Sequence, residues 1–428
     1  MVINNECAGQ ANKMVNSKAT PALTLGRRTF VGAAAATAGL VRSRRAAAAQ
    51  TIRIGVLTDM SGPFADNSGP GSVVSAELAA ADFMAAHPEL KVEVISADML
   101  NKPDVGANIA RKWYDEENVD LILDVPSSAV ALAVGELSHQ RDKLIITVTA
   151  GDPRLTGAYC KPTLIQWTYD LWALANATSR SLVAAGGNKW FTIAGDYVTG
   201  HDLAEDVAQV VESLGAKSVG KAFYPFPQTT DFSSFLLQAV SSGASIVACS
   251  NAGADAINIL KQAHEFQLAK QGVKLAALVM TEPVIKAIGL EAAQGTYCTA
   301  AFYWDMNDGT RAFAERFEAR RKVKPTMFQA GAYSAATHFL KAVAAAGPEK
   351  AKASGKAIAD QMKAMRTNDP LFGTGQVRQD GKFIHPMYVF RVKSPDESKY
   401  PWDFYTLVDT IPADKAFQSI EAAGCKPA

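Results

Sequence analysis

The sequence predicts an α/β protein of two lobes, each built on an open parallel sheet. Short runs of Val, Ile and Leu alternate with helical patterns along the chain, and this alternation occurs in two successive sets. With 428 residues, the chain is also longer than one hydrophobic core usually organises. The charge is balanced, with 43 basic and 42 acidic residues, so nucleic acid and anionic membranes are not expected partners.

The first 49 residues are expected to be an export signal rather than part of the fold. In "LGRRTFVGAAAATAGL", Arg27 and Arg28 precede an apolar run, Phe30–Val41, that is too short to span a bilayer. The small residues Ala46–Ala49 then form a pattern that a signal peptidase cuts. This arrangement resembles the twin-arginine signal of bacteria, with a mitochondrial-type leader or a structural helix as alternatives. We therefore expect a soluble mature chain in the periplasm.

The first set of strands follows directly. Their apolar residues are continuous enough for a buried parallel sheet, and apolar residues at three-to-four spacing between them predict helices. The predicted strands are 51–59, 90–98, 119–126, 143–150 and 163–170.

The second set repeats this pattern and ends differently. Its predicted strands are 189–196, 218–226, 244–251, 273–281 and 295–305. After Trp304 the sequence becomes rich in helical patterns. The final part predicts two strands around a turn-rich loop, Ser394–Pro401.

Four cysteines follow the leader: Cys160, Cys249, Cys298 and Cys425. In an oxidising compartment they allow three pairings, and their spacing selects none of them. Cys249 lies within "SIVACSN", so we expect a buried apolar side chain there. The sequence contains no CxxC pair, so a structural zinc site is not expected.

Small polar residues follow two neighbouring strands of the first set. Ser127 and Ser128 open a predicted helix, where hydroxyl and backbone N–H groups can hold an anion. Thr149, Ala150 and Gly151 follow the next strand, and their small size lets a ligand approach the backbone. Ligands of open parallel sheets bind beyond the carboxyl ends of the strands, so these residues are candidate ligand contacts, although each stretch also fits an ordinary helix cap.

The second set has its own candidates at corresponding positions. Tyr197 follows the strand 189–196, and Asn251 and Asp255 surround a Gly-rich helix start. Glu282 follows the strand 273–281. These side chains could equally be solvated loop residues. If they face the first set across a cleft, they supply the second wall of a binding site.

Catalytic motifs are missing from the sequence. It has no GxSxG nucleophile elbow, and "HEFQL" at His264 lacks the second histidine of a zinc-protease helix. "GQVRQDGKF" departs from a phosphate-binding loop in length and has Phe where Ser or Thr is needed. We therefore predict a binding protein without a cofactor rather than an enzyme.

Five stretches together resemble the periplasmic solute-binding proteins of branched-chain-amino-acid-type ABC transporters, the Leu/Ile/Val-binding family. They are "IRIGVLTDMSGPFADNSGPGSV", "FTIAGDYVTGHDLAEDV", "QTTDFSSFLLQAVSSGASIV", "LEAAQGTYCTAAFYWD" and "SKYPWDFYTLV". The resemblance implies the type I fold, with two Rossmann-like lobes joined by three hinge crossings. It also implies a monomer that closes on a small ligand and delivers it to membrane permease subunits. Matching the chain to this fold gives a first lobe of 51–168 and 305–385 and a second lobe of 169–304 and 386–428.

The resemblance also implies roles for individual residues. Ser127 and Ser128, and then Thr149 with Gly151, match the family's carboxylate-holding positions. Tyr197 matches the tyrosine that closes over the ligand from the second lobe.

Two further positions bear on the ligand class. Phe64 matches a position that shapes the side-chain pocket, and Glu282 lies one position from the acid that meets an α-ammonium. We therefore expect an aromatic or other small organic acid before a branched-chain amino acid, and an amide or urea-type solute third. A periplasmic sensor that presents its closed form to a receptor is the alternative function, and an amidohydrolase would need a nucleophile–base pair that the sequence lacks.

Overall fold

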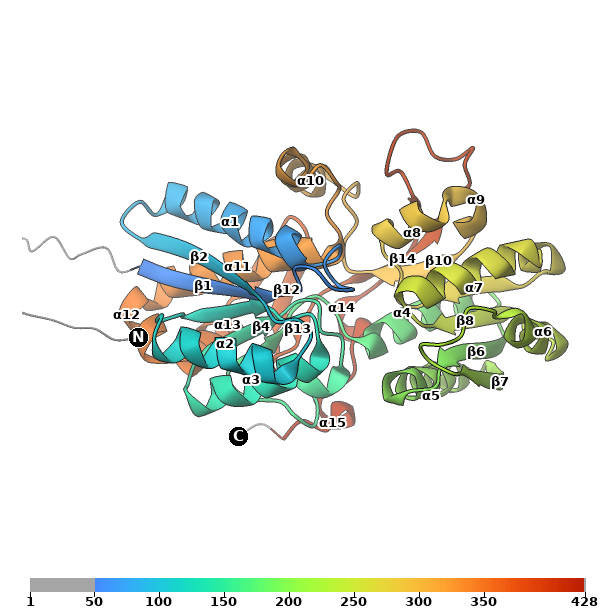
Figure 1. Ribbon diagram of the computed structural model, residues 1–428, viewed down its shortest axis with the longest axis horizontal. Coiled ribbons are helices and arrows are strands. Elements are labelled where there is room, and N and C mark those ends of the chain that lie inside the picture. Colours follow the sequence, from blue (N-terminus) through green and yellow to red (C-terminus); the bar gives the residue numbers. More distant parts are fainter. Residues whose placement is uncertain (1–50, 427–428) are drawn as a thin grey trace, which may run out of the picture. The chain divides into compact units, whose positions relative to one another are not determined.

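The first lobe is built on a five-stranded parallel sheet with the order β2-β1-β3-β4-β5 (Figure 1). The computed structural model describes residues 51–426. The strands are β1 (Thr51–Thr58), β2 (Lys91–Asp98), β3 (Leu121–Asp124), β4 (Leu144–Thr147) and β5 (Leu164–Gln166).

Helices cover both faces of this sheet. One face packs against α2 (Pro103–Asp115) and α3 (Ser128–Gln140), through side chains such as Leu57 and Ile122. The other face packs against α1 (Gly69–Ala86) and α11 (Met327–Ala346), through side chains such as Ile54. The first lobe also contains η1 (Pro153–Leu155), α10 (Asp308–Arg321), α12 (Pro348–Ala353) and α13 (Gly355–Ala364).

The second lobe is built on a seven-stranded sheet with the order β15-β14-β10-β9-β8-β6-β7. The strands from β10 to β7 in this order are parallel, whereas β14 and β15 are joined in antiparallel fashion at one edge. The strands are β6 (Lys189–Gly195), β7 (Lys217–Tyr224), β8 (Ile246–Ser250), β9 (Lys274–Ala277), β10 (Tyr297–Ala300), β14 (Met387–Val392) and β15 (Tyr405–Ile411).

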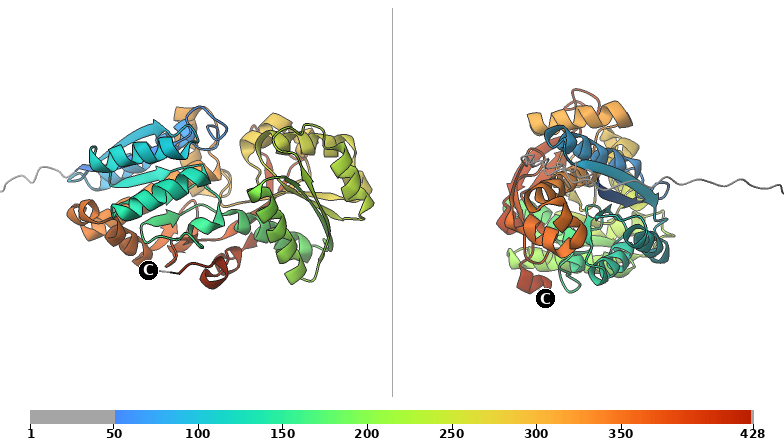
Figure 2. Two further views of the ribbon diagram at one scale, coloured as in Figure 1. Left: turned by 60° about the horizontal axis from the view of Figure 1, so that its bottom comes forward. Right: turned by 90° about the vertical axis from the view of Figure 1, so that its left-hand side faces the viewer.

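The helices of the second lobe also lie on two faces of their sheet (Figure 2). Alternate residues of β8 point to opposite faces, so Ile246 packs with α4 and α5 while Val247 packs with α6 and α7. The helices are α4 (Leu171–Ala184), α5 (Val198–Ser213), α6 (Ser233–Ser241), α7 (Gly253–Glu265), η2 (Leu268–Gln271), α8 (Glu282–Ile288) and α9 (Leu290–Ala293). None of the helices within residues 51–426 is long and apolar enough to cross a membrane.

A small antiparallel sheet lies beside the first lobe. It consists of β11 (Arg366–Asp369), β12 (Gly373–Val377) and β13 (Phe383–Ile384). Its short strands were not among the predicted elements. An isolated bridge between Gln166 and Lys382 joins this region to the end of β5.

Several predicted strands are shorter in the structure than expected, and in two of them the remaining part crosses between the lobes. The stretch 163–170 forms a strand only over β5, and the stretch 295–305 only over β10. Trp167, Phe302 and Tyr303 in the remaining parts are nevertheless buried, so apolar character there reflects a buried crossing rather than a strand. The third crossing joins β13 to β14.

The last part of the chain returns from the second sheet to the first lobe. After β15, the C-terminal arm (residues 412–426) contains α14 (Ala413–Ala416) and α15 (Ile420–Ala423) and runs back beside the first lobe (Figure 2). Asn176 of α4 donates hydrogen bonds to the carbonyls of Lys415, at 2.7 Å, and Ala416. The arm thus contacts α4 of the second lobe first, and its end lies against the first lobe.

A disulfide makes that attachment covalent. Cys425 of the arm is bonded to Cys160, and these residues are 265 positions apart in the chain. Among the described residues Cys249 and Cys298 are free and buried, so only one bond forms between the four cysteines, and the expectation of a buried side chain at Cys249 is confirmed. The bond holds the arm against the loop that follows η1.

Cys160→Ser should lower the free energy of unfolding by roughly 2–4 kcal/mol, because the unfolded chain regains the freedom that the cross-link removes. Urea unfolding without reductant measures this difference. The wild-type protein with reductant should match the variant, and reductant should leave the variant unchanged. Equal stability of the two proteins without reductant would contradict a stabilising role for the bond.

Candidate functional site

The start of α3 provides the first part of the candidate site. Ser127 is the cap residue before this helix, and its side chain makes no capping hydrogen bond. Ser128 is the first residue of the helix, and its hydroxyl accepts a hydrogen bond from the backbone N–H of Asp152 at 3.3 Å. Both hydroxyl hydrogens are therefore available to a ligand, beside the N–H groups of a 13-residue helix.

The backbone that leads into α3 has an unusual conformation. Asp124 and Val125 have φ values of 86° and 50°, in the left-handed region that β-branched residues such as valine rarely adopt. Backbone hydrogen bonds hold this conformation: the N–H of Val125 donates to the carbonyl of Leu57 at 2.9 Å, and the N–H of Val148 donates to the carbonyl of Asp124 at 3.1 Å. Backbone strain of this kind is often found at binding sites.

The loop after β4 lies beside this turn. Thr149 donates its hydroxyl hydrogen to Asp124 Oδ1 at 2.7 Å, and the hydroxyl of Tyr169 donates to the carbonyl of Thr149 at 2.8 Å. A Cβ atom at Gly151 would lie 2.6 Å from the Tyr169 hydroxyl oxygen, so any other residue here would displace the buried Tyr169 side chain. Ala150 is buried and accepts a hydrogen bond from Gln166. A hydroxyl has one hydrogen, so in this state Thr149 has none left for an anion.

Asp124 joins these two segments and was missed by the sequence analysis. This fully buried carboxylate also accepts a hydrogen bond from Thr58 at 2.6 Å, which adds the end of β1 to the arrangement. Burial raises its pKa to about 6, although the hydrogen bonds from Thr58 and Thr149 act in the opposite direction. The feature of the sequence that could have identified Asp124 is its position as an acidic residue at the end of the otherwise apolar strand "LILD".

Phe64 lies in the loop after β1 and is half-buried. The carboxylate of Asp59 holds this loop by accepting hydrogen bonds from the N–H groups of Gly62, at 2.7 Å, and Phe64, at 2.9 Å. It also accepts one from the side chain of Asn101 at 2.7 Å. The position of Phe64 is thus set by a carboxylate that the sequence analysis did not identify.

In the second lobe, the structure brings three candidates together. Tyr197 caps α5, is 38% exposed and packs its ring against Phe226, with 4.7 Å between the ring centroids. Burial and the nearby carboxylate of Asp255 raise the pKa of Tyr197. Asp255 accepts a hydrogen bond from the Tyr224 hydroxyl at 2.8 Å, and Asn251 also lies close to Tyr224. Asn251 is buried, and neither of its polar side-chain atoms has a hydrogen-bond partner among residues 51–426.

Glu282 lies in different surroundings. It is the first residue of α8 and is 3% exposed, and its Oε1 atom has no hydrogen-bond partner. Burial raises its pKa to about 8. The ionisable groups affected by its charge are Cys298, Tyr303 and Tyr405, none of which belongs to the group around Tyr197.

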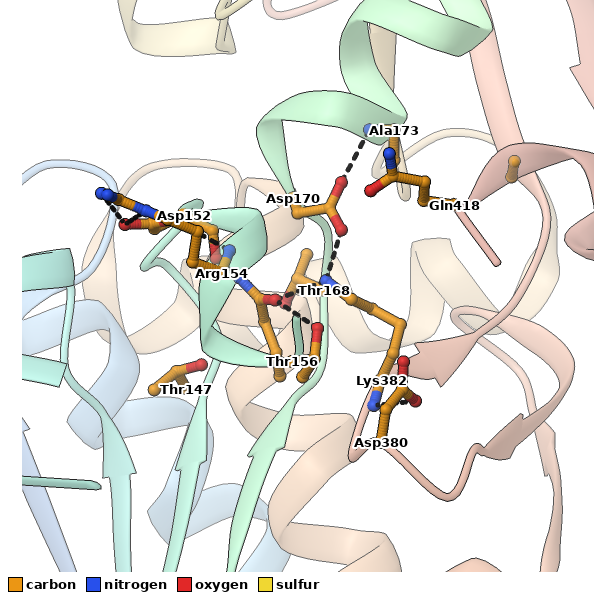
Figure 3. Close-up of polar contacts among 12 residues, drawn as sticks. Thr147, Asp152, Arg154, Thr156, Thr168, Asp170, Ala173, Asp380, Lys382 and Gln418 are labelled. Atoms are coloured by element: carbon orange, nitrogen blue, oxygen red, sulfur yellow. Dashed lines mark hydrogen bonds and ion pairs between the residues drawn. The ribbon is translucent and has the colours of Figure 1, made fainter. Parts of the chain in front are cut away.

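A buried polar network connects the first-lobe loop to two of the crossings (Figure 3). Lys382 forms an ion pair with Asp170 at 2.6 Å, and these side chains are 2% and 4% exposed. Asp170 also accepts a hydrogen bond from the N–H of Ala173 and so caps α4. Lys382 donates in addition to the side-chain oxygen of Gln166. The sequence contains no local pattern that pairs residues 212 positions apart.

Gln166 extends this network into the candidate site. Its amide nitrogen donates to the carbonyls of Ala150, at 2.8 Å, and Asp152, at 3.1 Å. Thr156 donates to its amide oxygen at 3.2 Å. The loop that follows β4 is therefore attached to the same buried group that joins the crossings.

Two lobes with polar groups at the carboxyl ends of their strands define a solute-binding protein. A family model described as "Periplasmic binding protein" matches residues 51–399. The chain belongs to this family, in its type I, Leu/Ile/Val-binding-protein-like group, which confirms the resemblance seen in the sequence. The family works with ABC transporter permeases, binds small molecules and is exported to the periplasm.

Solved structures also show the similarity of this chain to periplasmic binding proteins. A periplasmic binding protein from Burkholderia mallei is 39% identical, with a TM-score of 0.79, and the match covers 88% of this chain and 99% of that one. A branched chain amino acid ABC transporter periplasmic ligand-binding protein from Burkholderia xenovorans LB400 is 36% identical, with a TM-score of 0.84 and the same coverage. A solute-binding protein from Rhodopseudomonas palustris in complex with benzoate shares the fold at 20% identity, with a TM-score of 0.71, over 88% of this chain and 100% of that one. No match was found among curated proteins.

Glu282→Gln should make the protein more stable than the wild type as the pH rises. The pKa of Glu282 is about 8 in the folded protein, whereas an ordinary glutamate has a pKa of 4.5. As the pH rises from 4.5 to 8, the unfolded chain therefore loses this proton before the folded protein does, and the folded protein becomes less stable. Glutamine does not titrate, so the stability difference should grow from about pH 5 and reach on the order of 3 kcal/mol near pH 8.

Thermal unfolding across this pH range measures the difference. Glu291→Gln, at an exposed position of α9, is the matched control and should show a difference that does not change with pH. Parallel stability curves for wild type and Glu282→Gln would show that the Glu282 carboxyl is not held neutral by the fold.

Proposed function

We propose that the protein captures a small carboxylate by closure of its two lobes and delivers it, chemically unchanged, to an ABC importer. The observation that supports this most strongly is the start of α3. The hydroxyls of Ser127 and Ser128 both retain a free hydrogen there, beside unpaired helix N–H groups. Hydroxyl and N–H donors at a helix start are suited to a carboxylate.

The second lobe supplies the opposite wall in this proposal. Tyr197 offers an exposed aromatic ring and hydroxyl, and the buried amide of Asn251 has unused hydrogen-bonding capacity. Closure would bring these groups over a ligand held by the first lobe and exclude water from the carboxylate. Phe64 would contact the remainder of the ligand.

The ligand class follows from the acidic side chains. An amino acid carries an ammonium that needs an ionised partner, because burying it alone costs several kcal/mol. The carboxyl of Glu282 lies outside the group around Tyr197, and the Tyr224 hydroxyl already occupies Asp255 Oδ2. We therefore favour an aromatic or other small organic acid over a branched-chain amino acid. The benzoate bound by the R. palustris protein belongs to this favoured class, whereas the B. xenovorans relative carries the branched-chain name.

A thermal-shift screen of the mature protein tests the ligand class directly, because a ligand that binds only the folded protein raises its melting temperature. Benzoate, 4-hydroxybenzoate, leucine, short aliphatic acids and simple amides form the panel. We expect the aromatic acids to give the largest shifts. A shift with leucine alone would move the assignment to amino acids, and no shift with any carboxylate would contradict the proposed function.

Ser127→Ala combined with Ser128→Ala should weaken binding of the selected acid at least tenfold, because hydrogen bonds to charged groups contribute roughly 1.5–3 kcal/mol each. Tyr197→Ala should weaken it by a similar factor through loss of the second wall. Calorimetry measures both. Tyr159→Ala is the control, since Tyr159 is a comparably exposed tyrosine, at 50%, outside the candidate site. Unchanged affinity in the serine variant would contradict the placement of the carboxylate.

We also propose export of the folded protein by the twin-arginine route and function as a monomer in the periplasm. Arg27 and Arg28 lie outside the residues that the structure describes, so this proposal is based on the sequence alone. Replacing both arginines by lysine should abolish export, because the twin-arginine signal is recognised by a receptor. Cell fractionation measures the loss. Replacing Arg44 and Arg45 by lysine is the control, and normal export of the Arg27/Arg28 variant would contradict the proposed route.

A further inference from the structure

Asp124 occupies the point where three segments of the first lobe meet. It is the last residue of β3, it accepts hydrogen bonds from Thr58 at the end of β1 and from Thr149 after β4, and it is fully buried. It precedes Ser127 by three positions. The carboxylate therefore lies directly behind both segments that face the proposed ligand.

Within residues 51–426, the groups that act on the charge of Asp124 are hydroxyls and another carboxylate rather than a cation. The groups that influence its protonation are its burial, the hydroxyls of Thr58, Thr149 and Ser72, and the carboxylate of Asp59. Thr58 and Asp59 come from the end of β1, Ser72 from α1 and Thr149 from the loop after β4. Burial and the Asp59 carboxylate raise the pKa of Asp124 and the hydroxyls lower it, which places it at about 6.

A second anion beside Asp124 would change this balance. In the proposed function, the ligand carboxylate docks against Ser127 and the loop of Thr149, so two negative charges would come close together in a partly dry site. Two carboxylates that share a site do not both remain ionised, and one of them binds a proton. Of the two, Asp124 is fully buried, and its pKa is already raised to about 6.

Protonation also changes what Thr149 can do. With Asp124 ionised, Thr149 spends its only hydroxyl hydrogen on Asp124 Oδ1. Once that carboxyl carries a proton, its O–H can donate to the Thr149 oxygen, and the Thr149 hydrogen becomes free for the ligand. One proton thus removes a repulsive charge and creates a hydrogen-bond donor at the site.

We propose that Asp124 takes up one proton from solvent when the ligand carboxylate docks, and that Thr149 then turns its hydroxyl hydrogen towards the ligand. The inference rests on the proposed function, since it needs a carboxylate at this position. The proton bonds to a carboxylate oxygen of Asp124 and returns to solvent when the ligand leaves. Asp124 is thus a positioning residue that makes carboxylate capture stronger as the pH falls.

Calorimetry with the acid selected from the panel, benzoate first, tests this in the mature protein. Titrations near pH 5.5, 6.5 and 7.5, each in two buffers of different ionisation enthalpy, report the number of protons bound together with the ligand. We expect uptake of up to about one proton at the higher pH values, and an affinity that rises by up to about tenfold per pH unit as the pH falls.

The variant Asp124→Asn distinguishes proton uptake by Asp124 from proton uptake by other titrating groups. Its amide can donate to the Thr149 oxygen as the protonated acid would, so binding should persist near pH 7.5 without proton uptake and with little pH dependence. Asp120→Asn is the matched control: Asp120 is also buried, precedes the other end of β3, and pairs with Lys352 at 3.1 Å. This control should retain the wild-type proton uptake.

Two variants of Thr149 test the hydroxyl itself. Thr149→Ser should keep the pH dependence, whereas Thr149→Val should bind more weakly and lose most of it. These variants also keep the inference testable if Asp124→Asn does not fold. Binding with the same proton uptake in Asp124→Asn and wild type, or none in the wild type, would overturn this inference alone. Failure of every carboxylate to bind would overturn the proposed function and this inference with it.

Discussion

The buried ion pair between Lys382 and Asp170 is the constraint on which the arrangement of the lobes depends. Both charges are removed from water, so each needs the other, and loss of one partner would leave an uncompensated charge at a cost of several kcal/mol. The pair joins the first crossing to the segment that leads into the third. Any movement of the lobes that preserves this pair must keep these two segments in contact.

The same ion pair also affects the geometry of the binding loops. Gln166 links Lys382 to the carbonyls of Ala150 and Asp152, so the loop after β4 cannot shift without disturbing buried hydrogen bonds. Asp124 fixes this loop from the other side through Thr149. The donors proposed for the ligand therefore lie on loops, yet two buried polar groups restrict those loops before any ligand arrives. Such preorganisation lowers the cost of binding.

Most of the fold was predictable because hydrophobic periodicity records local burial. The two sets of parallel strands, the helices between them and the final hairpin agree with the structure, and the family resemblance is confirmed. The errors came from segments such as Trp167 to Asp170, where buried crossings have the apolar character of strands. The small sheet of β11, β12 and β13 was missed since its short strands carry little periodic signal. The Cys160–Cys425 pairing depends on a contact between distant segments that spacing alone does not record.

The candidate site was predictable only in part. Position relative to strand ends makes Tyr197, Asn251 and Asp255 candidate ligand contacts; this stays a prediction, although the structure places the three side chains near one another. It gave no information about Asp124 or Lys382, because their importance depends on partners far away in the sequence. It also grouped Glu282 with the other candidates, although its carboxyl lies among Cys298, Tyr303 and Tyr405. Strand ends locate a site, whereas tertiary contacts determine the charge and hydrogen bonding of its residues.

The bond between Cys160 and Cys425 encloses the whole second sheet within one covalent ring. A protease that cuts any exposed loop inside this ring, such as Ser394–Pro401, would open the backbone without separating the two fragments. The nicked protein would keep its full mass in electrophoresis under non-reducing conditions. The two fragments would also stay linked, so their strands would remain at high local concentration and could stay paired. A cut in one loop therefore need not inactivate the protein.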